Sequence, residues 1–191
     1  MNFCSRCGEK VYLQVPEGDN RSRYVCEACN TIHYQNPKIV TGCVVEWNGR
    51  ILLCRRAIEP GMGLWTLPAG FMENGETAHA GAMREALEEA NAQIEIDDLY
   101  TLFNLPRINQ VHIHFRGRLL NPAVCPGTES LEVDLFTEQE IPWEGIAFHV
   151  IHETLKYYFQ DRRAGCYRMR SGTIEHPSLS PGGHWFKQLR E

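Results

Sequence analysis

Three glutamates, Glu85, Glu88 and Glu89, are spaced so that a helix would place them together. At about 100° per residue they fall within an arc of about 100° on one helix face. Like charges three or four residues apart cost a helix about 0.2–0.5 kcal/mol per pair, a penalty that a divalent cation would reverse. Side chains that offer only oxygen select Mg²⁺ or Mn²⁺. The spacing therefore indicates a site for one of these ions, although a solvated acidic face is the ordinary explanation of such a pattern.

The helix that would carry the glutamates extends over residues 77–90. Thr77 is a suitable N-cap, and Asn91 is a suitable left-handed C-cap. We expect the helix to be anchored through the face opposite the glutamates. The residues of this face are Met83, Ala86, Leu87 and Ala90.

Two Cys-x-x-Cys pairs, Cys4 with Cys7 and Cys26 with Cys29, form a second group of potential ligands. The 18 residues between the pairs fit the spacing of zinc-binding knuckles. Four thiolates close a tetrahedral Zn²⁺ site and leave no position for water, so such a site is structural. A redox or disulfide arrangement and an iron site are the alternatives. The few apolar residues near this end of the chain also favour a zinc ribbon, because they cannot form a core alone.

The chain has eight cysteines, but its first ten residues lack the apolar core of an export signal. Its apolar runs are far shorter than the about 20 residues that cross a bilayer. Thiols that bind metal are typical of a reducing compartment. We therefore expect a cytoplasmic protein that does not associate with a membrane.

Charge is distributed unevenly along the chain. Residues 39–161 carry 18 acidic and 8 basic side chains, whereas residues 162–191 carry 2 acidic and 6 basic ones. Proteins whose main partner is a nucleic acid normally present a cationic surface to its phosphates. The acidic central region argues against such a partner, and it implies that a phosphate-bearing substrate would be bound through metal ions.

The elements around the glutamate helix are mostly strands. Asn48-Gly49 predicts a hairpin between the first two of them, and residues 146–160 have the apolar spacing of a second helix. The predicted strands are 39–47, 50–55, 99–105, 110–120 and 130–136.

We predict three parts in the chain. Residues 1–36 would form the zinc ribbon, residues 37–161 the catalytic domain, and residues 162–191 a basic tail without clear periodicity.

The segment from Gly70 to Ala92 resembles the Nudix box, Gly-x5-Glu-x7-Arg-Glu-U-x-Glu-Glu-x-Gly-U, in which U is a bulky aliphatic residue. The residues that match are Gly70, Glu76, Arg84, Glu85, Glu88 and Glu89. Alanine stands at both aliphatic positions, 86 and 92, and Asn91 replaces the final glycine. These departures affect packing and the helix cap but leave the carboxylates in place.

The resemblance implies an α+β fold, a Nudix α/β/α sandwich with a mixed sheet, preceded by the zinc ribbon. It implies that Glu85 and Glu89 coordinate Mg²⁺ or Mn²⁺, and that the backbone carbonyl of Ala69 completes the site. Glu88 would be a further ligand or the general base.

Other residues receive roles around this site. By resemblance, Glu76 and Arg84 would pair and hold the loop against the helix. Arg55 and Arg56, at the end of a predicted strand, are candidates for contacting substrate phosphate, with ordinary surface charge as the alternative.

Two further pairs are weaker candidates. Glu129 or Glu132 precedes a predicted strand and would add a late carboxylate, as a metal ligand or base, if it is not an ordinary surface residue. His112 and His114 share one face of an alternating strand but have no third ligand at a fixed spacing, so we assign them to packing or hydrogen bonding.

The ribbon and the residues flanking the box look like one Nudix subgroup, which is associated with ADP-ribose or FAD pyrophosphatase activity. This resemblance implies hydrolysis of a small nucleotide to AMP and a phosphorylated remainder, by a protein that is a homodimer. A second zinc-ribbon subgroup cleaves NADH, but its motif beyond the box does not follow Ala92 here. The alternatives are a NADH or other dinucleotide pyrophosphatase and, in a different class, an inactive scaffold whose ribbon binds RNA or protein.

Overall fold

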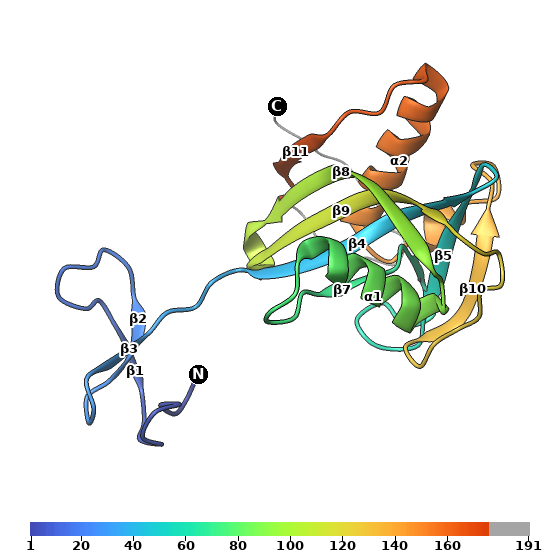
Figure 1. The fold of residues 1–191 in the computed structure, drawn as a ribbon. Helices are drawn as coiled ribbons and strands as arrows, with labels where there is room; N and C mark the ends of the chain where they lie inside the picture. Colours follow the sequence, from blue (N-terminus) through green and yellow to red (C-terminus); the bar gives the residue numbers. More distant parts are fainter. Residues whose placement is uncertain (176–191) are drawn as a thin grey trace. The chain divides into compact units, whose positions relative to one another are not determined.

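The computed structural model describes residues 1–175 and divides the chain into two compact units, Met1–Pro37 and a unit that begins at Lys38 (Figure 1). The first unit contains three short strands, β1 (Tyr12–Gln14), β2 (Arg23–Cys26) and β3 (Thr31–His33), which pair antiparallel in chain order. Its buried apolar residues are Cys4, Val11 and Cys26. So small a core cannot offset the entropy of ordering the chain, and the unit therefore depends on its cysteine cluster.

The second unit is built on one mixed sheet. Within the described residues its strands follow the order β10–β5–β4–β9–β8–β11, while β6 pairs with β5 and β7 with β4. The pairs β4–β9 and β8–β11 are parallel, and the other pairs are antiparallel. The strands are β4 (Lys38–Trp47), β5 (Arg50–Arg56), β6 (Trp65–Thr66), β7 (Ala69–Phe71), β8 (Ile94–Leu105), β9 (Gln110–Leu119), β10 (Ser130–Phe136) and β11 (Arg170–Thr173).

The sheet divides where the β4–β5 hairpin opens. Asn48 and Gly49 have φ values of 47° and 80°, as a tight hairpin turn requires, so the predicted turn is confirmed. β4 and β5 pair with each other only next to this turn. Farther along, β7 lies beside β4 and β6 lies beside β5. The sheet therefore fixes the position of β7, from which the chain continues into the first helix.

Two α-helices, α1 (Ala78–Ala90) and α2 (His149–Ala164), cover opposite faces of the sheet (Figure 1). Successive strand residues point to opposite faces, so Cys43 and Val45 pack in the α1 core and Val44 packs in the α2 core. Two 3₁₀ turns, η1 (Pro106–Ile108) and η2 (Trp143–Gly145), lie in the connections. The predicted α/β/α sandwich is confirmed. No helix among residues 1–175 is long and apolar enough to span a membrane.

The caps of α1 are as predicted, whereas its anchoring face is confirmed only in part. The Thr77 hydroxyl accepts a hydrogen bond from the Ala80 amide, and Asn91 adopts the left-handed conformation. The prediction that Met83 and Leu87 are buried was wrong, because these side chains are 46% and 50% exposed. Ala86 and Ala90, which were predicted on the anchoring face, are fully buried against the sheet, together with Ala82. Small side chains let the helix lie close to the sheet, which also buries part of the acidic face.

The chain beyond residue 161 contributes to the sheet. Helix α2 continues to Ala164 and ends at Gly165, which has a φ of 66°. β11 then pairs in parallel with β8, and an ion pair between Arg170 and the buried Asp161 joins the strand to the helix. The segment predicted as a basic tail therefore supplies an edge strand, and its part beyond residue 175 lies outside the described residues.

Candidate active site

A cavity of about 1230 Å³ lies in the second unit, between α1, the loops that flank it and the start of α2. Its acidic part carries Glu85, Glu88 and Glu89 from α1 and Glu129 from the loop before β10. Its apolar lining includes Val40, Phe71, Leu105, Ile108, Phe148 and Ile174. One cavity therefore offers a group of carboxylates beside a surface suited to an organic ring system.

Glu85 and Glu89 are the buried carboxylates of this site, since they are only 8% and 6% exposed. They lie one helical turn apart on α1, at the edge of the face that Ala82, Ala86 and Ala90 press against the sheet. The backbone amide of Ala69 donates a hydrogen bond to Oε2 of Glu89 at 3.3 Å. Burial of two adjacent carboxylates is costly unless cations compensate them.

The electrostatics of these residues shows that this compensation is incomplete. Burial, followed by the nearby charge of Glu85, raises the pKa of Glu89 from its usual 4.5 to about 8. Burial also raises the pKa of Glu85, although Arg84 acts in the opposite direction. The site therefore favours either a proton or a metal cation between these side chains.

Arg84 is shared among several partners, which explains why it does not neutralise the site. Its guanidinium contacts Glu76 at 2.9 Å, Glu85 at 2.8 Å and Glu88 at 2.9 Å, and it donates to the Phe71 carbonyl. The predicted Glu76–Arg84 pair is thus present and holds the loop on the helix. Glu88 lies farther out than its neighbours, with a side chain that is 58% exposed.

Gly70 of β7 lies where the strand closely approaches the Glu85 side chain of α1. A Cβ atom at this position would overlap the carboxylate of Glu85. The same strand brings Ala69 into the cavity wall beside Glu89. Two buried carboxylates and exposed backbone of a glycine loop form an all-oxygen donor set, which fits Mg²⁺ or Mn²⁺. The coordination by the Ala69 carbonyl stays a prediction.

The structure separates the paired candidates Arg55 and Arg56. Arg56 lines the cavity and its guanidinium lies 5.1 Å from the ring centre of Phe148. Arg55 donates to the carbonyl of Gly63 and pairs with Glu132 at 3.4 Å. Arg56 is therefore placed to meet a ligand in the cavity, whereas Arg55 is engaged at the surface.

The late carboxylates separate in the same way. Glu129 lines the cavity, and its negative charge contributes to the raised pKa values of Glu85 and Glu89, after burial and the nearer charged groups. Glu132 is exposed and paired with Arg55. The sequence could not distinguish Glu129 from Glu132 as the candidate carboxylate, because both lie near the start of the same predicted strand.

His112 and His114 are buried on β9, as packing residues would be. Burial lowers the pKa of His112 to about 4 and that of His114 to about 3, so both rings are neutral at pH 7. His114 Nδ1 lies 3.2 Å from the hydroxyl of Thr101, and His112 Nε2 lies 2.9 Å from Oε1 of Gln110. His112 also lines the cavity.

Sequence reasoning did not single out Phe148, His149 or Ile174 as cavity residues. Each lies far along the chain from the glutamate helix, and no local pattern could have found it. Their positions follow from the packing of α2 and β11 against the sheet.

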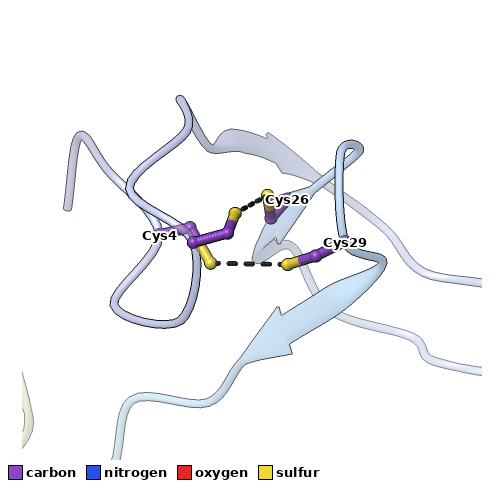
Figure 2. A group of neighbouring side chains, drawn as sticks. Cys4, Cys26 and Cys29 are labelled. Atoms are coloured by element: carbon purple, nitrogen blue, oxygen red, sulfur yellow. Dashed lines mark hydrogen bonds between the residues drawn. The ribbon is translucent and has the colours of Figure 1, made fainter.

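The four cysteines of the first unit meet as predicted. Their sulfur atoms all lie within 4.8 Å of one another, with Cys4 to Cys29 at 3.7 Å and Cys7 to Cys26 at 3.5 Å. A tetrahedral zinc site with Zn–S bonds of about 2.3 Å requires sulfurs about 3.8 Å apart. Figure 2 shows the sulfurs of Cys4, Cys26 and Cys29 turned toward a common centre. The cluster fits one structural zinc ion.

Contacts around the cluster favour a thiolate at Cys29. The hydroxyl of Thr31 lies 3.1 Å from the sulfur of Cys29, and this contact, followed by those with Cys7 and Cys26, lowers the pKa of that thiol to about 6, whereas the neighbouring thiols raise the pKa of Cys7 to about 12. The amide of Arg6 donates to the sulfur of Cys4, and His33 Nε2 lies 3.3 Å from the same atom. Such outer contacts orient metal ligands and stabilise their charge.

Comparison with known proteins agrees with both sites. Residues 36–153 match the NUDIX domain family, and residues 2–35 match the zinc ribbon family described as Nudix N-terminal. The first match covers more than half of the chain, so the protein belongs to the Nudix family.

The chain is similar to several characterised members of this family. A crystal structure of a NUDIX hydrolase from Nitrosomonas europaea is 56% identical with a TM-score of 0.90, over 92% of this chain and 100% of that one. An ADP-ribose pyrophosphatase of Methanocaldococcus jannaschii is 26% identical over 113 residues, 57% of this chain and 67% of the relative. A NAD-capped RNA hydrolase NudC of Photorhabdus laumondii is 32% identical over 94 residues, 48% of this chain and 34% of the relative. The chain spans about one third to two thirds of the length of such curated relatives.

Proposed function

We propose that the protein hydrolyses the pyrophosphate bond of a nucleoside diphosphate derivative, with ADP-ribose or FAD as substrate, and releases AMP and a phosphorylated remainder. The observation that carries this proposal is the pair of buried carboxylates, Glu85 and Glu89, in the wall of a large cavity. Burial raises the pKa of both carboxyl groups, so Arg84 does not offset the free-energy cost of ionising them. A divalent cation would supply the balance and bind a pyrophosphate at the same time.

The residues of the cavity divide the chemical work. Glu85 and Glu89 would hold the metal. Arg84 pairs with Glu85, and Gly70 leaves room for the Glu85 carboxylate, so both residues fix its position. Bound Mg²⁺ supplies neutralisation of phosphate charge and activation of water. Glu88 or Glu129 accepts the proton of the attacking water, because both carboxylates line the cavity and are exposed. The guanidinium of Arg56 contacts a phosphate oxygen.

The size and lining of the cavity support a dinucleotide-like substrate. About 1230 Å³ exceeds what a nucleoside phosphate alone needs, since drug-sized ligands occupy pockets of about 300–1,000 Å³. The apolar lining includes the ring of Phe71, which is half exposed and available for stacking on a base. The ADP-ribose assignment also rests on the subgroup resemblance and on the relative that carries this activity in its name.

A substrate panel tests the proposal. The full chain with Mg²⁺ is incubated with ADP-ribose, FAD, NADH, NAD-capped RNA and a nucleoside triphosphate, and products are separated by chromatography. We expect AMP to appear fastest from ADP-ribose or FAD, and not at all with the Glu85→Gln variant. Preference for NADH or the capped RNA would replace the substrate assignment. Retention of RNA on a filter without any turnover would favour the scaffold alternative.

The cytoplasmic location and the homodimer are parts of the same proposal. None of the eight cysteines forms a disulfide, which supports a reducing compartment. Sedimentation of the zinc-loaded protein at micromolar concentration tests the dimer, and a monomer mass would reject it.

A further inference from the structure

A group of potential ligands lies on α2, away from the carboxylates of α1. His149, His152 and Glu153 occupy positions i, i+3 and i+4, so they share one face at the start of the helix. One ligand atom from each lies within 4.8 Å of the other two. Among residues 1–175, the only other group of three or more such ligands within this distance is the cysteine cluster. No role in the proposed hydrolysis uses this group.

Glu153 is a buried carboxylate beside these imidazoles. The residue is only 8% exposed, yet its nearest basic atoms are Nδ1 of His152 at 3.5 Å and Nζ of Lys156 at 3.8 Å. Charge-assisted hydrogen bonds are normally about 2.7–2.9 Å long. The Lys156 side chain is also largely exposed, so solvent screens its charge. The contact with His152, followed by the charges of Lys156 and His149, outweighs burial and lowers the pKa of Glu153, so the buried carboxylate is ionised beside the two imidazoles.

The two imidazoles are held in place beside this carboxylate. Their rings are nearly parallel, with an interplanar angle of 15° and centres 6.2 Å apart. The edge of Trp143 packs against His152 at 5.1 Å between ring centres. Rings that are fixed by their packing lose little freedom when they coordinate an ion.

We propose that His149, His152 and Glu153 bind a divalent cation of the zinc class, Zn²⁺, Co²⁺ or Ni²⁺, at the wall of the cavity. Two imidazole nitrogens and one carboxylate select such ions over Mg²⁺, which prefers oxygen ligands. Three protein ligands leave at least one coordination position open, as in catalytic rather than structural sites. Because His149 lines the cavity, the ion would border the space that a ligand occupies. The proposal does not depend on the identity of the substrate.

Binding of Co²⁺ to the full chain tests this site. The ribbon keeps its zinc, and Mg²⁺ is present in large excess to occupy the carboxylates of α1. Equilibrium dialysis and the visible absorption of nitrogen-coordinated Co²⁺ measure binding. We expect one Co²⁺ per chain that is retained in Glu89→Gln and weakened more than about tenfold in His152→Gln and in Glu153→Gln. The matched control is His79→Gln, an exposed histidine on α1, which should bind as the unaltered chain does.

Equal Co²⁺ binding by the unaltered chain, His152→Gln and Glu153→Gln would overturn the proposal, as would loss of binding in Glu89→Gln alone. A second measurement needs no variant. Paramagnetic Co²⁺ should shift the imidazole proton resonances of His149 and His152 in the unaltered protein and leave that of His79 unchanged. Unshifted resonances of the two α2 histidines at saturating Co²⁺ would likewise reject the site.

Discussion

Replacing Glu89 by glutamine tests separately how much the buried carboxylate destabilises the fold and how much it contributes to turnover. The pKa of Glu89 is raised from 4.5 to about 8 by burial and by Glu85, so the folded protein binds this proton more tightly than the unfolded chain does. The metal-free protein must therefore lose stability as pH rises from about 4.5 to about 8. At pH 7 this group alone opposes folding by on the order of 3 kcal/mol. Glutamine keeps the shape and can still accept the hydrogen bond of the Ala69 amide.

We expect the metal-free Glu89→Gln variant to be as stable as the unaltered protein near pH 4.5 and more stable by about 3 kcal/mol near pH 7. Urea unfolding followed by tryptophan fluorescence measures this difference, because every tryptophan lies beyond the ribbon. Turnover with Mg²⁺ should fall by at least about two orders of magnitude, since a metal ligand is lost. Glu88→Gln is the matched control for stability and should change it by less than about 0.5 kcal/mol, because that side chain is exposed.

Two results would refute this reasoning. A stability difference that does not change with pH would show that Glu89 titrates normally in the folded protein. Turnover close to that of the unaltered enzyme at saturating Mg²⁺ would show that Glu89 is not a metal ligand.

Three further predictions concern packing, the glycine loop and zinc. Leu87→Ala should lower the free energy of unfolding by less than about 1 kcal/mol, because the side chain is half exposed. Ala86→Leu should lower it by about 1–3 kcal/mol, because the larger side chain overpacks the interface between α1 and the sheet. Thermal melting that ranks the two variants in the opposite order would contradict the observed orientation of α1. Gly70→Ala should displace the Glu85 carboxylate and lower turnover at least about tenfold while the protein stays folded, and unchanged kinetics would show that the close approach is not needed. Metal analysis should find about one zinc per chain, and Cys26→Ser should release it and unfold the first unit without changing the tryptophan-detected melting of the second; stoichiometric disulfides in the native protein would contradict this.

Much of the active site could be predicted because its signals are local. Each of three features depends only on residues that are close together in the sequence. These features are the spacing of the glutamates on one helix, the Thr77 and Asn91 caps, and the Asn48-Gly49 turn. The paired Cys-x-x-Cys knuckles are local in the same sense, and each brings two sulfurs together regardless of the rest of the fold.

The period of the helix predicts which residues share a face of α1, but only the tertiary structure determines which residues the sheet buries. A stripe of apolar residues predicts which face of a helix is less polar, but it does not predict how closely the helix will pack against a sheet. Here the alanines let α1 approach closely, so Leu87 remains exposed while Glu85 and Glu89 are buried and acquire raised pKa values. The main free-energy cost of the acidic face is therefore the desolvation of its buried carboxylates. This cost is far larger than the repulsion between like charges on an exposed helix, which is what the sequence implied.

The sequence by itself determined which residues form the two groups of candidate metal ligands, since short-range geometry and side-chain chemistry suffice for each. It could not distinguish Arg56 from Arg55 or Glu129 from Glu132, because these neighbours differ only in which side of a strand or loop they occupy. Nor could it bring His149 to the cavity wall, since that contact joins α2 to loops more than fifty residues away. Only the packing of both helices on the sheet fixes which of these side chains faces the cavity, because burial depends on contacts between segments that no local pattern connects.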